Sequence, residues 1–377
     1  MSQADLPPAA GMSGGQRPLR LLAFTGATGW GGAEIVLGHL LAALGPHVRA
    51  TVLGVDAEIT ARVGARRPGT PVRLVPPVRG KRDLAAMHAH RQAIAAARPD
   101  VVQVNLPVPF AEQYTVLAAV TVPRVRVVAV EHLPMGTASG PARVLKRATA
   151  RRLAAHLAVG SGAAGEVERL CGLPAGSVRP VPNGVPDPAA GYPGRPRRPG
   201  SGFVVGAVGR LHRHKGLDVL VRAVAELPDA RLVLVGDGPE RGALDRLAGA
   251  LGMRSRLTVT GWTEEAGAYL PSFDVVALPS RVEGLPLALL EAMRAGRAVV
   301  VTAVGSVPDV VVEGRTGLVV PVDDPAALTA ALRRLRDDPG LRSRLGAAAR
   351  DLVCRRFTPA AMAAAYEDVY EEILRHR

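Results

Sequence analysis

Two glutamates near an expected helix start are the residues best suited to chemistry. Glu283 lies in a polar loop after the apolar run 275–278, and Glu291 stands eight positions further on. Apolar residues after Gly284 recur at helical spacing until Gly296, so two helical turns separate the carboxylates and both can face one crevice. The loop also delivers backbone N–H groups and a positive helix end to a sheet edge, where α/β proteins bind anions. A carboxylate beside an anion site must bind something else, and sugar hydroxyls are natural partners.

A second set of residues suits the anion itself. Gly209-Arg210 closes the apolar run 203–208, and Lys215-Gly216 opens the next helical pattern. Two fixed cations beside a glycine turn suit a diphosphate, which needs charge and donors on several oxygens at once. Lys215 is one of only three lysines among 47 basic residues, so an arginine-rich composition does not account for it. The alternative is a solvated loop with incidental charges; we favour the anion site.

The run Glu283-Gly284-Leu285-Pro286-Leu287, followed by Glu291-Ala292-Met293, resembles the paired-glutamate motif of retaining glycosyltransferases of family 4, which have the GT-B architecture. The resemblance extends from about Leu19 to the C-terminus. It implies a metal-independent hexosyltransferase that uses a nucleotide-diphosphate sugar. The expected donor-binding residues are Arg210, Lys215, Gly284, Leu285, Pro286, Leu287 and Glu291, with Glu283 and His132 as the catalytic pair.

The resemblance also implies a role for each position. Arg210 and Lys215 would neutralise the diphosphate, Glu283 would hold hydroxyls of the donor sugar, and Glu291 would bind the ribose. His132, which ends an expected strand, would position sugar and acceptor; the usual reading of a lone histidine is a core residue. The departing phosphate is expected to take the acceptor's proton, so no separate base is assigned.

A glycine-rich loop at 26–32 opens the first helix of the chain. Its Gly31-Gly32-Ala33-Glu34 segment is similar to the family's acceptor-side loop, which closes toward the donor phosphates. The loop misses the strict G-x-G-x-x-G spacing of a dinucleotide site. Asp56, however, stands roughly where a ribose-binding acid would lie in such a fold. An NAD-dependent enzyme with two Rossmann domains therefore stays open as an alternative.

Composition allows two domains with separate cores in 377 residues, 48% of them hydrophobic. The formal net charge is +14, carried almost entirely by arginine, which is more typical of genome composition than of a ligand. A nucleic-acid-binding protein is a second alternative, although aromatics are only 3% and no known binding module is present. Two cysteines, Cys171 and Cys354, provide no disulfide framework.

Continuous Val/Leu runs alternate with helical patterns along both halves of the chain. Such runs predict strands covered on both faces, hence parallel sheets and an α/β fold of two doubly wound, Rossmann-like domains that face each other across a crevice. Helices are expected at 32–44, 82–97 and 143–155 and from 325 onward. Strands are expected at 19–24, 49–55, 72–75, 101–104, 125–130, 156–159, 203–208, 231–235, 257–260, 274–278, 298–302 and 317–320.

Domain boundaries follow from changes in composition. We expect a flexible tail at 1–17, an acceptor-binding domain at 18–185, a Pro/Gly/Arg linker at 186–201 and a nucleotide-sugar-binding domain at 202–358. The resemblance implies that the last segment, 359–377, crosses back onto the first domain.

The sequence also bears on metal binding and on contact with a membrane. His212 with His214, and His88 with His90, lack a third ligand nearby in sequence, and no Asp-x-Asp motif occurs, so we expect no metal and no cofactor. A basic helix face comprising Arg143, Lys146, Arg147 and Arg151 is most simply solvated, and its alternative role is docking on anionic lipid. The N-terminus lacks a signal-like apolar core, and no apolar run is long enough to span a membrane.

The sequence thus favours a retaining glycosyltransferase, with a UDP-sugar as first choice of donor and a GDP-sugar next. The acceptor would be a hydroxyl of a glycan, glycolipid or small molecule, by default in bacterial surface polysaccharide or glycoconjugate synthesis. We expect a cytoplasmic protein, with a peripheral contact at the inner face of the membrane as the lipid alternative. No nucleic-acid partner is expected.

Overall fold

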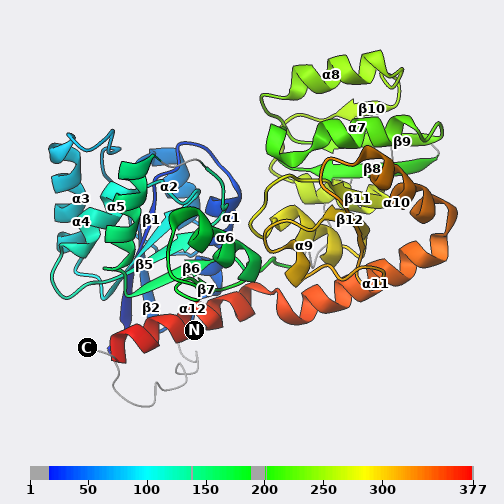
Figure 1. Cartoon of the computed structure of the whole chain (residues 1–377). Helices are drawn as coiled ribbons and strands as arrows, with labels where there is room; N and C mark the ends of the chain where they lie inside the picture. Colours follow the sequence, from blue (N-terminus) through cyan, green and yellow to red (C-terminus); the bar gives the residue numbers. More distant parts are fainter. Residues whose placement is uncertain (1–16, 137–138, 188–199, 201, 376–377) are drawn as a thin grey trace, which may run out of the picture.

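The computed structural model describes residues 17–136, 139–187, 200 and 202–375. Two parallel sheets, each flanked by helices, form two α/β domains that lie side by side (Figure 1). The predicted fold class, two doubly wound domains, is confirmed. The tail expected at 1–17 and the linker expected at 186–201 fall mostly outside the described residues.

The first sheet has the strand order β3-β2-β1-β4-β5-β6-β7, and every pairing in it is parallel. Its central strands are buried along nearly their whole length, as expected for Val/Leu runs covered on both faces. The strands are β1 Leu19–Thr25, β2 Val48–Gly54, β3 Val72–Leu74, β4 Val101–Leu106, β5 Arg126–Glu131, β6 Ala155–Ala158 and β7 Arg179–Pro180.

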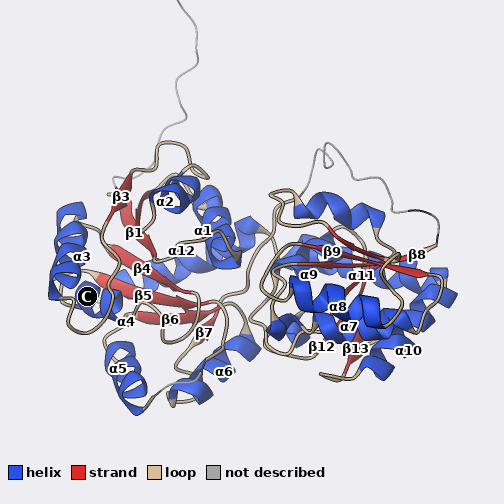
Figure 2. Ribbon diagram, turned by 90° about the horizontal axis from the view of Figure 1, so that it is seen from above, coloured by secondary structure: helices blue, strands red, loops and turns tan. Residues whose placement is uncertain are grey.

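Helices cover both faces of this sheet (Figure 2). Side chains of α1 pack on one face together with those of the C-terminal helix, while α3 and α4 pack on the other. The helices of this domain are α1 Gly32–Ala43, α2 Ala57–Gly64, α3 Leu84–Ala97, α4 Gln113–Val120, α5 Gly140–Ala150 and α6 Ser161–Cys171.

The second sheet repeats the same topology, in the order β10-β9-β8-β11-β12-β13. One of its faces packs against α7, α8 and α10, and the other against α9 and α11. The strands are β8 Phe203–Val208, β9 Ala230–Val235, β10 Leu257–Val259, β11 Val275–Leu278, β12 Ala298–Thr302 and β13 Leu318–Val320. The helices are α7 Leu217–Ala225, α8 Arg241–Ala250, α9 Leu287–Arg294, α10 Pro325–Asp337 and α11 Pro339–Arg356, with short 3-10 turns η1 Arg213–Lys215, η2 Ala266–Ser272 and η3 Val307–Asp309.

Aspartates begin several of these helices. Asp56, Asp324 and Asp338 each accept a hydrogen bond from the backbone N–H three residues further on, at 2.8–3.0 Å. A short acceptor at this position satisfies one of the free N–H groups of the first turn. These caps explain why α2, α10 and α11 start where they do.

The last helix, α12 (Pro359–Arg375), leaves the second domain and lies along the first (Figure 1). Tyr366, Val369 and Tyr370 are buried in the core formed by α1 and the first sheet. The Tyr370 hydroxyl donates to Gln103 Oε1 on β4. A single chain segment therefore ties the end of the protein into the opposite domain.

The strands expected from the sequence lie within two residues of those observed, whereas some helices differ. The short helices α2 and α4 lie between expected strands, where the alternating pattern predicts helices but does not give their bounds. The helix expected at 143–155 is α5, which begins three residues earlier and ends at Ala150. Within the described ranges, no helix is both long enough and apolar enough to cross a membrane.

Candidate functional site

The second domain places a small pocket at the point where its strand order reverses, between β8 and β11. The chain leaves β8 toward one side of the sheet and β11 toward the other, and such a switch point is where open α/β sheets bind ligands. Gly209, Arg210, Lys215 and Ser280 are among the residues that line the pocket. The sequence prediction that the Arg210 and Lys215 loop meets the Glu283 loop therefore agrees with the geometry.

Glu283 is at the centre of this meeting point. Its side chain is 4% exposed, and Oε1 accepts hydrogen bonds from Lys215 Nζ and from the Ser280 hydroxyl, each at 2.7 Å. A buried carboxylate needs such partners, because desolvation of an unpaired charge is costly. Ser280 had no assigned role in the sequence analysis, since one hydroxyl in a loop gives no distinctive signal.

The turn that presents Lys215 depends on a glycine. Gly216 has φ 63° and follows the short turn η1. A Cβ at this position would lie 2.0 Å from the carbonyl oxygen of Pro279, the residue that follows β11. Only glycine combines this close approach with the left-handed conformation. The side chain of Arg210, by contrast, is exposed and points its charge toward solvent at the rim of the pocket.

Helix α9 starts immediately beyond the glutamate loop, with Pro286 before its first residue, Leu287. Glu291 lies on this helix, half-buried, and burial raises the pKa of its carboxyl to about 7. Among the described residues its carboxyl forms no hydrogen bond or ion pair. The structure therefore does not bring Glu291 into contact with Glu283; it places Glu291 on the helix that the Glu283 loop begins.

His132 belongs to the first domain but adjoins the glutamate loop of the second. A Cβ on Gly284 would lie 1.9 Å from the His132 carbonyl oxygen, so the two loops touch at a glycine. Burial lowers the pKa of the His132 imidazole to about 4, although the nearby Glu131 opposes the shift, and the ring is neutral at physiological pH. Its Nε2 is 3.5 Å from Asn105 Oδ1 on β4.

Polar contacts join the two domains beneath these loops. Asn183 Nδ2 donates to the carbonyl of Leu285 at 2.8 Å, and the backbone N–H of Ser161 at the start of α6 donates to Asp309 Oδ2 at 2.8 Å. The hydrogen bond of Asn183 to the glutamate loop could not be predicted from the sequence, because its partner is 102 residues away.

The predicted glycines Gly31 and Gly32 lie at the start of α1, away from the second domain's pocket. Glu34, two residues later, is buried and accepts a hydrogen bond from the Thr25 hydroxyl at 3.1 Å. Burial raises the pKa of this carboxyl. The structure shows this segment as a braced loop, and Gly31 and Gly32 make no contact with Lys215 among the described residues.

A second bridge between the domains forms around one guanidinium. Arg62 on α2 lies 4.0 Å from the ring centroid of Trp30 and 5.9 Å from that of Trp262. It also forms an ion pair with Glu264 at 2.7 Å. Trp262 is 59% exposed and therefore does not belong to the core. Cation–π contacts of this kind add to an ion pair at a partly exposed site.

The structure does not favour the alternative of an NAD-dependent enzyme, because Asp56, its candidate ribose-binding acid, has another role. Asp56 Oδ1 accepts the Ile59 N–H at 3.0 Å as the cap of α2, so this carboxylate is engaged by its own helix. His90 is likewise engaged, with Nε2 2.8 Å from the Pro76 carbonyl oxygen. Within the described residues no three His, Cys, Asp or Glu side chains cluster as metal ligands would.

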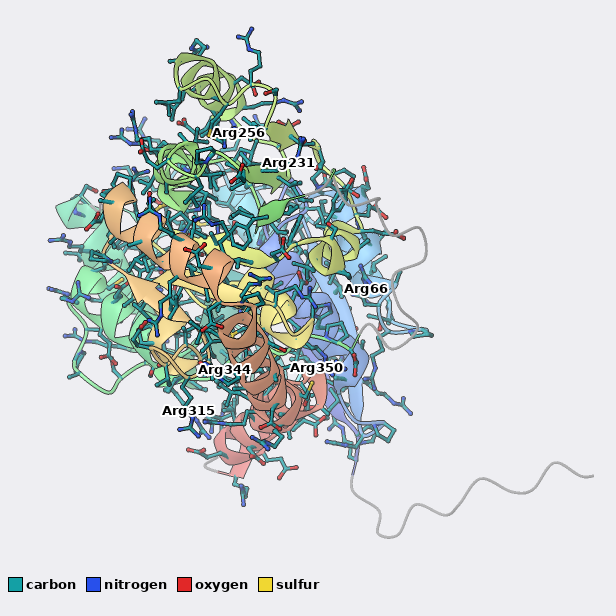
Figure 3. The ribbon with its side chains drawn as sticks, turned by 90° about the vertical axis from the view of Figure 1, so that its right-hand side faces the viewer. Arg66, Arg231, Arg256, Arg315, Arg344 and Arg350 are labelled. Atoms are coloured by element: carbon teal, nitrogen blue, oxygen red, sulfur yellow. The ribbon has the colours of Figure 1, made fainter. Side chains whose placement is uncertain are left out.

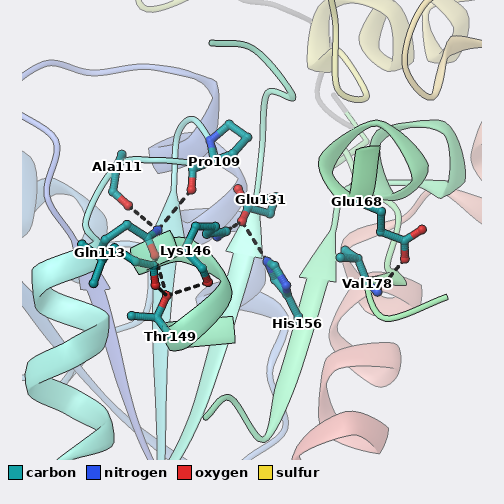
Figure 4. A network of polar contacts seen from close by, with 10 residues as sticks. Pro109, Ala111, Gln113, Glu131, Lys146, Thr149, His156, Glu168 and Val178 are labelled. Carbon is teal, nitrogen blue, oxygen red and sulfur yellow. Dashed lines mark hydrogen bonds and ion pairs between the residues drawn. The ribbon is translucent and has the colours of Figure 1, made fainter. Parts of the chain in front are cut away.

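One predicted surface charge is wrong. Lys146 is buried, and its Nζ lies 2.5 Å from Glu131 Oε1, which also lies 2.8 Å from His156 Nε2 (Figure 4). Burial alone would raise the pKa of Glu131, but Lys146 and His156 outweigh it and hold that pKa below its usual value. Lys146 therefore cannot belong to a basic helix face, because a charge this deeply buried must stay with its partner.

The arginines that carry most of the positive charge come from several elements and do not form a single cluster in the view of Figure 3. Figure 3 shows arginines from several elements across one side of the molecule, among them Arg231, Arg256 and Arg344. Arg256 donates to the carbonyl oxygens of Leu227 at 2.8 Å and Ala230 at 2.9 Å, and so binds the chain's own backbone. Such arginines serve the fold, which weakens a nucleic-acid interpretation of the net charge.

Comparison with known proteins agrees with this geometry. The family model described as Glycosyltransferase Family 4 matches residues 30–187, and the model described as Glycosyl transferases group 1 matches residues 202–338. Both domains belong to glycosyltransferase families. The resemblance found in the glutamate motif is thereby confirmed for each half of the chain.

Curated relatives match this chain over about half its length. The lipopolysaccharide core biosynthesis glycosyltransferase LpsD of Rhizobium meliloti is 38% identical over 173 residues, 46% of this chain and 50% of that protein. The alpha-D-kanosaminyltransferase of Streptomyces kanamyceticus is 36% identical over 174 residues, 44% of this chain and 45% of that protein. The chain thus spans about half the length of these relatives.

Solved structures show the same fold over nearly the whole chain. The crystal structure of Anabaena Alr3699/HepE in complex with UDP superposes with a TM-score of 0.79 at 19% identity, covering 94% of this chain and 100% of that one. The superposition supports the two-domain architecture. Because the identity is low, the ligand has to be argued from the site itself.

Proposed function

We propose that this chain is a retaining glycosyltransferase that moves a sugar from a nucleoside diphosphate donor, a UDP-sugar first and a GDP-sugar next, to an acceptor hydroxyl. The observation that carries the proposal is a pocket at the β8/β11 switch point, lined by Arg210, Lys215 and Ser280, in which Lys215 and Ser280 both donate to the adjoining Glu283. Cations for a diphosphate and a carboxylate for sugar hydroxyls thereby share one site.

The two cations would act on the leaving group. As the bond between the sugar and the diphosphate breaks, negative charge grows on the phosphate oxygens, and fixed positive groups stabilise it. Lys215 Nζ carries three donors and uses one toward Glu283, so it can bind a phosphate oxygen while keeping that contact. Arg210 would approach from the exposed rim, and the N–H groups of Gly284, Leu285 and Leu287 would add the positive end of α9.

The carboxylates and the histidine would act on the sugars. Lys215 and Ser280 both bind Glu283 Oε1, which leaves Oε2 to accept hydroxyls of the donor sugar. Glu291 on α9 would take the ribose hydroxyls. His132, neutral because of its low pKa, would hydrogen-bond rather than carry a charge. The acceptor oxygen would form the new bond to the sugar, and its proton would pass to the departing phosphate oxygen.

The setting of the reaction is proposed from the surface. We place the enzyme in the cytoplasm, in bacterial surface polysaccharide or glycoconjugate synthesis, working on a glycan, glycolipid or small-molecule acceptor without a metal or other cofactor. The membrane alternative now rests on exposed Arg143, Arg147 and Arg151 of α5 and its C-cap, beside Val144, which is 66% exposed. Basic and apolar side chains on one face suit anionic lipid headgroups.

A thermal-shift panel of UDP, GDP, ADP, TDP and NADH, each with and without EDTA, tests the proposal. A ligand that binds only the folded protein must raise its Tm. We expect a selective rise with UDP or GDP that EDTA does not change. A rise with NADH alone would overturn the assignment, and a rise abolished by EDTA would overturn its metal-independent form.

A further inference from the structure

Glu112 has a backbone conformation that its position does not explain. It stands just before α4 with φ 54° and ψ 18°, in the left-handed region. A non-glycine residue loses stability there, because its Cβ approaches the following carbonyl oxygen. Its side chain does not cap the helix either. If only the stability of the fold mattered, glycine, asparagine or a short capping residue would suit this position better than glutamate.

The buried side chain of Gln113 holds the loop that precedes Glu112 (Figure 4). Gln113 Nε2 donates to the carbonyl oxygens of Pro109 at 3.1 Å and Ala111 at 3.0 Å, while its Oε1 accepts from the Thr149 hydroxyl at 2.7 Å. These bonds fix the course of the loop before α4. Strain that the surroundings enforce in this way is typical of functional positions.

The carboxyl of Glu112 lies over the switch point of the first domain. A Cβ on Gly26, the residue after β1, would be 2.0 Å from Glu112 Oε1. Strands β1 and β4 are neighbours in the sheet, and the chain turns away from them in opposite directions. Thr115 donates to Oε2 at 3.2 Å, whereas Oε1 accepts no hydrogen bond from the described residues. Burial also raises the pKa of this carboxyl.

The two domains present glutamates from corresponding places. In the second domain the switch point lies between β8 and β11, and Glu283 is in the loop between β11 and α9. In the first domain it lies between β1 and β4, and Glu112 is in the loop between β4 and α4. The His132 loop is next to the Glu112 loop, because Leu133 N donates to the Pro107 carbonyl at 3.2 Å.

We propose that Glu112 is an acceptor-binding residue whose Oε1 accepts a hydrogen bond from a hydroxyl or ammonium group on a pyranose acceptor. The inference rests on the proposed function, which places the donor in the second domain. An uncommitted carboxyl oxygen at the first domain's switch point, beside the histidine loop, is suited to an acceptor's hydrogen-bond donors. Gly26 leaves the space that the carboxyl occupies.

The test compares Glu112→Gln and Glu112→Gly with Glu58→Gln, a matched change at an exposed glutamate of α2. The probes are methyl hexopyranosides and their 2-amino-2-deoxy counterparts, and the readout is nucleoside diphosphate release above hydrolysis. We expect Glu112→Gln to raise the KM of a probe by about tenfold or more, as for loss of a hydrogen bond to a charged group, with the donor KM unchanged. If the KM rises more for the aminated probes, the group that Glu112 binds is an ammonium. If it rises equally for both kinds of probe, the group is a hydroxyl.

A stability readout separates binding from a structural role. Glycine at position 112 relieves the left-handed conformation, so Glu112→Gly should have a Tm equal to or above that of the wild type. A fall in Tm in both Glu112 variants, an unchanged probe KM, or a wild type that uses none of the probes would each overturn the inference. Donor binding in the thermal-shift panel is independent of these results, so failure there points to the proposed function itself.

Discussion

Replacing Lys215 with alanine should weaken diphosphate binding far more than nucleoside binding. A hydrogen bond to a charged group contributes about 1.5–3 kcal/mol to a complex. Lys215 keeps its 2.7 Å pair with Glu283 in both the free and the bound protein, so the loss of that pair cancels in the binding free energy. The loss of about 1.5–3 kcal/mol corresponds to a roughly 10- to 150-fold higher Kd for UDP.

Isothermal titration with UDP and with uridine measures this difference directly. Arg213→Ala is the matched control, because Arg213 lies on the same turn, is exposed and does not line the pocket. We expect UDP affinity to fall in Lys215→Ala alone, with uridine affinity nearly unchanged in both variants. An equal loss for UDP and uridine would show that Lys215 shapes the loop rather than binding phosphate, and an equal loss in the Arg213 control would reduce the effect to general charge.

Four other substitutions or conditions have defined outcomes. Lys146→Ala should lower the free energy of unfolding by about 3–5 kcal/mol by stranding the Glu131 carboxylate, whereas exposed Arg143→Ala should cost little; similar values would contradict the buried pair. Because the pKa of Glu131 is held low, its contribution is present above the ordinary carboxyl pKa and is lost as the pH falls, which acid unfolding of wild type and Lys146→Ala should show. Arg62→Ala should change tryptophan emission, since both tryptophans of the chain lie against this guanidinium, and an unchanged spectrum would refute the contact. With a pKa of about 4, His132 stays neutral from pH 6 to 8, so it should cause no rate change there; a titration near its ordinary pKa would contradict this burial.

The strands and their alternation with helices could be predicted, because continuous Val/Leu runs are typical of buried strands. A continuous apolar segment must be covered on both faces, and β4 is buried throughout its length. That Arg210, Lys215 and Glu283 lie at one edge of the sheet could also be predicted, since each follows such a run and the carboxyl ends of parallel strands share one edge.

Long-range partners set the limit of sequence reasoning. Lys146 lies among other basic residues of α5, as a surface lysine would. Nothing near it in the sequence indicates that it pairs with Glu131, at the end of β5. Glu112 gave no signal, because its conformation depends on hydrogen bonds that a buried Gln113 makes to the preceding loop. Short helices such as α4 hold too few turns to display an apolar period.

The most direct measurement is proton NMR of the first product formed from an α-linked UDP- or GDP-sugar, recorded before mutarotation, for the wild type and for Glu283→Gln. The account predicts an α-configured product from the wild type, and a rate lower by orders of magnitude in the variant, whose Tm stays near that of the wild type. A β-configured product would contradict the retaining mechanism, and a near-normal rate in Glu283→Gln would remove Glu283 from the chemistry.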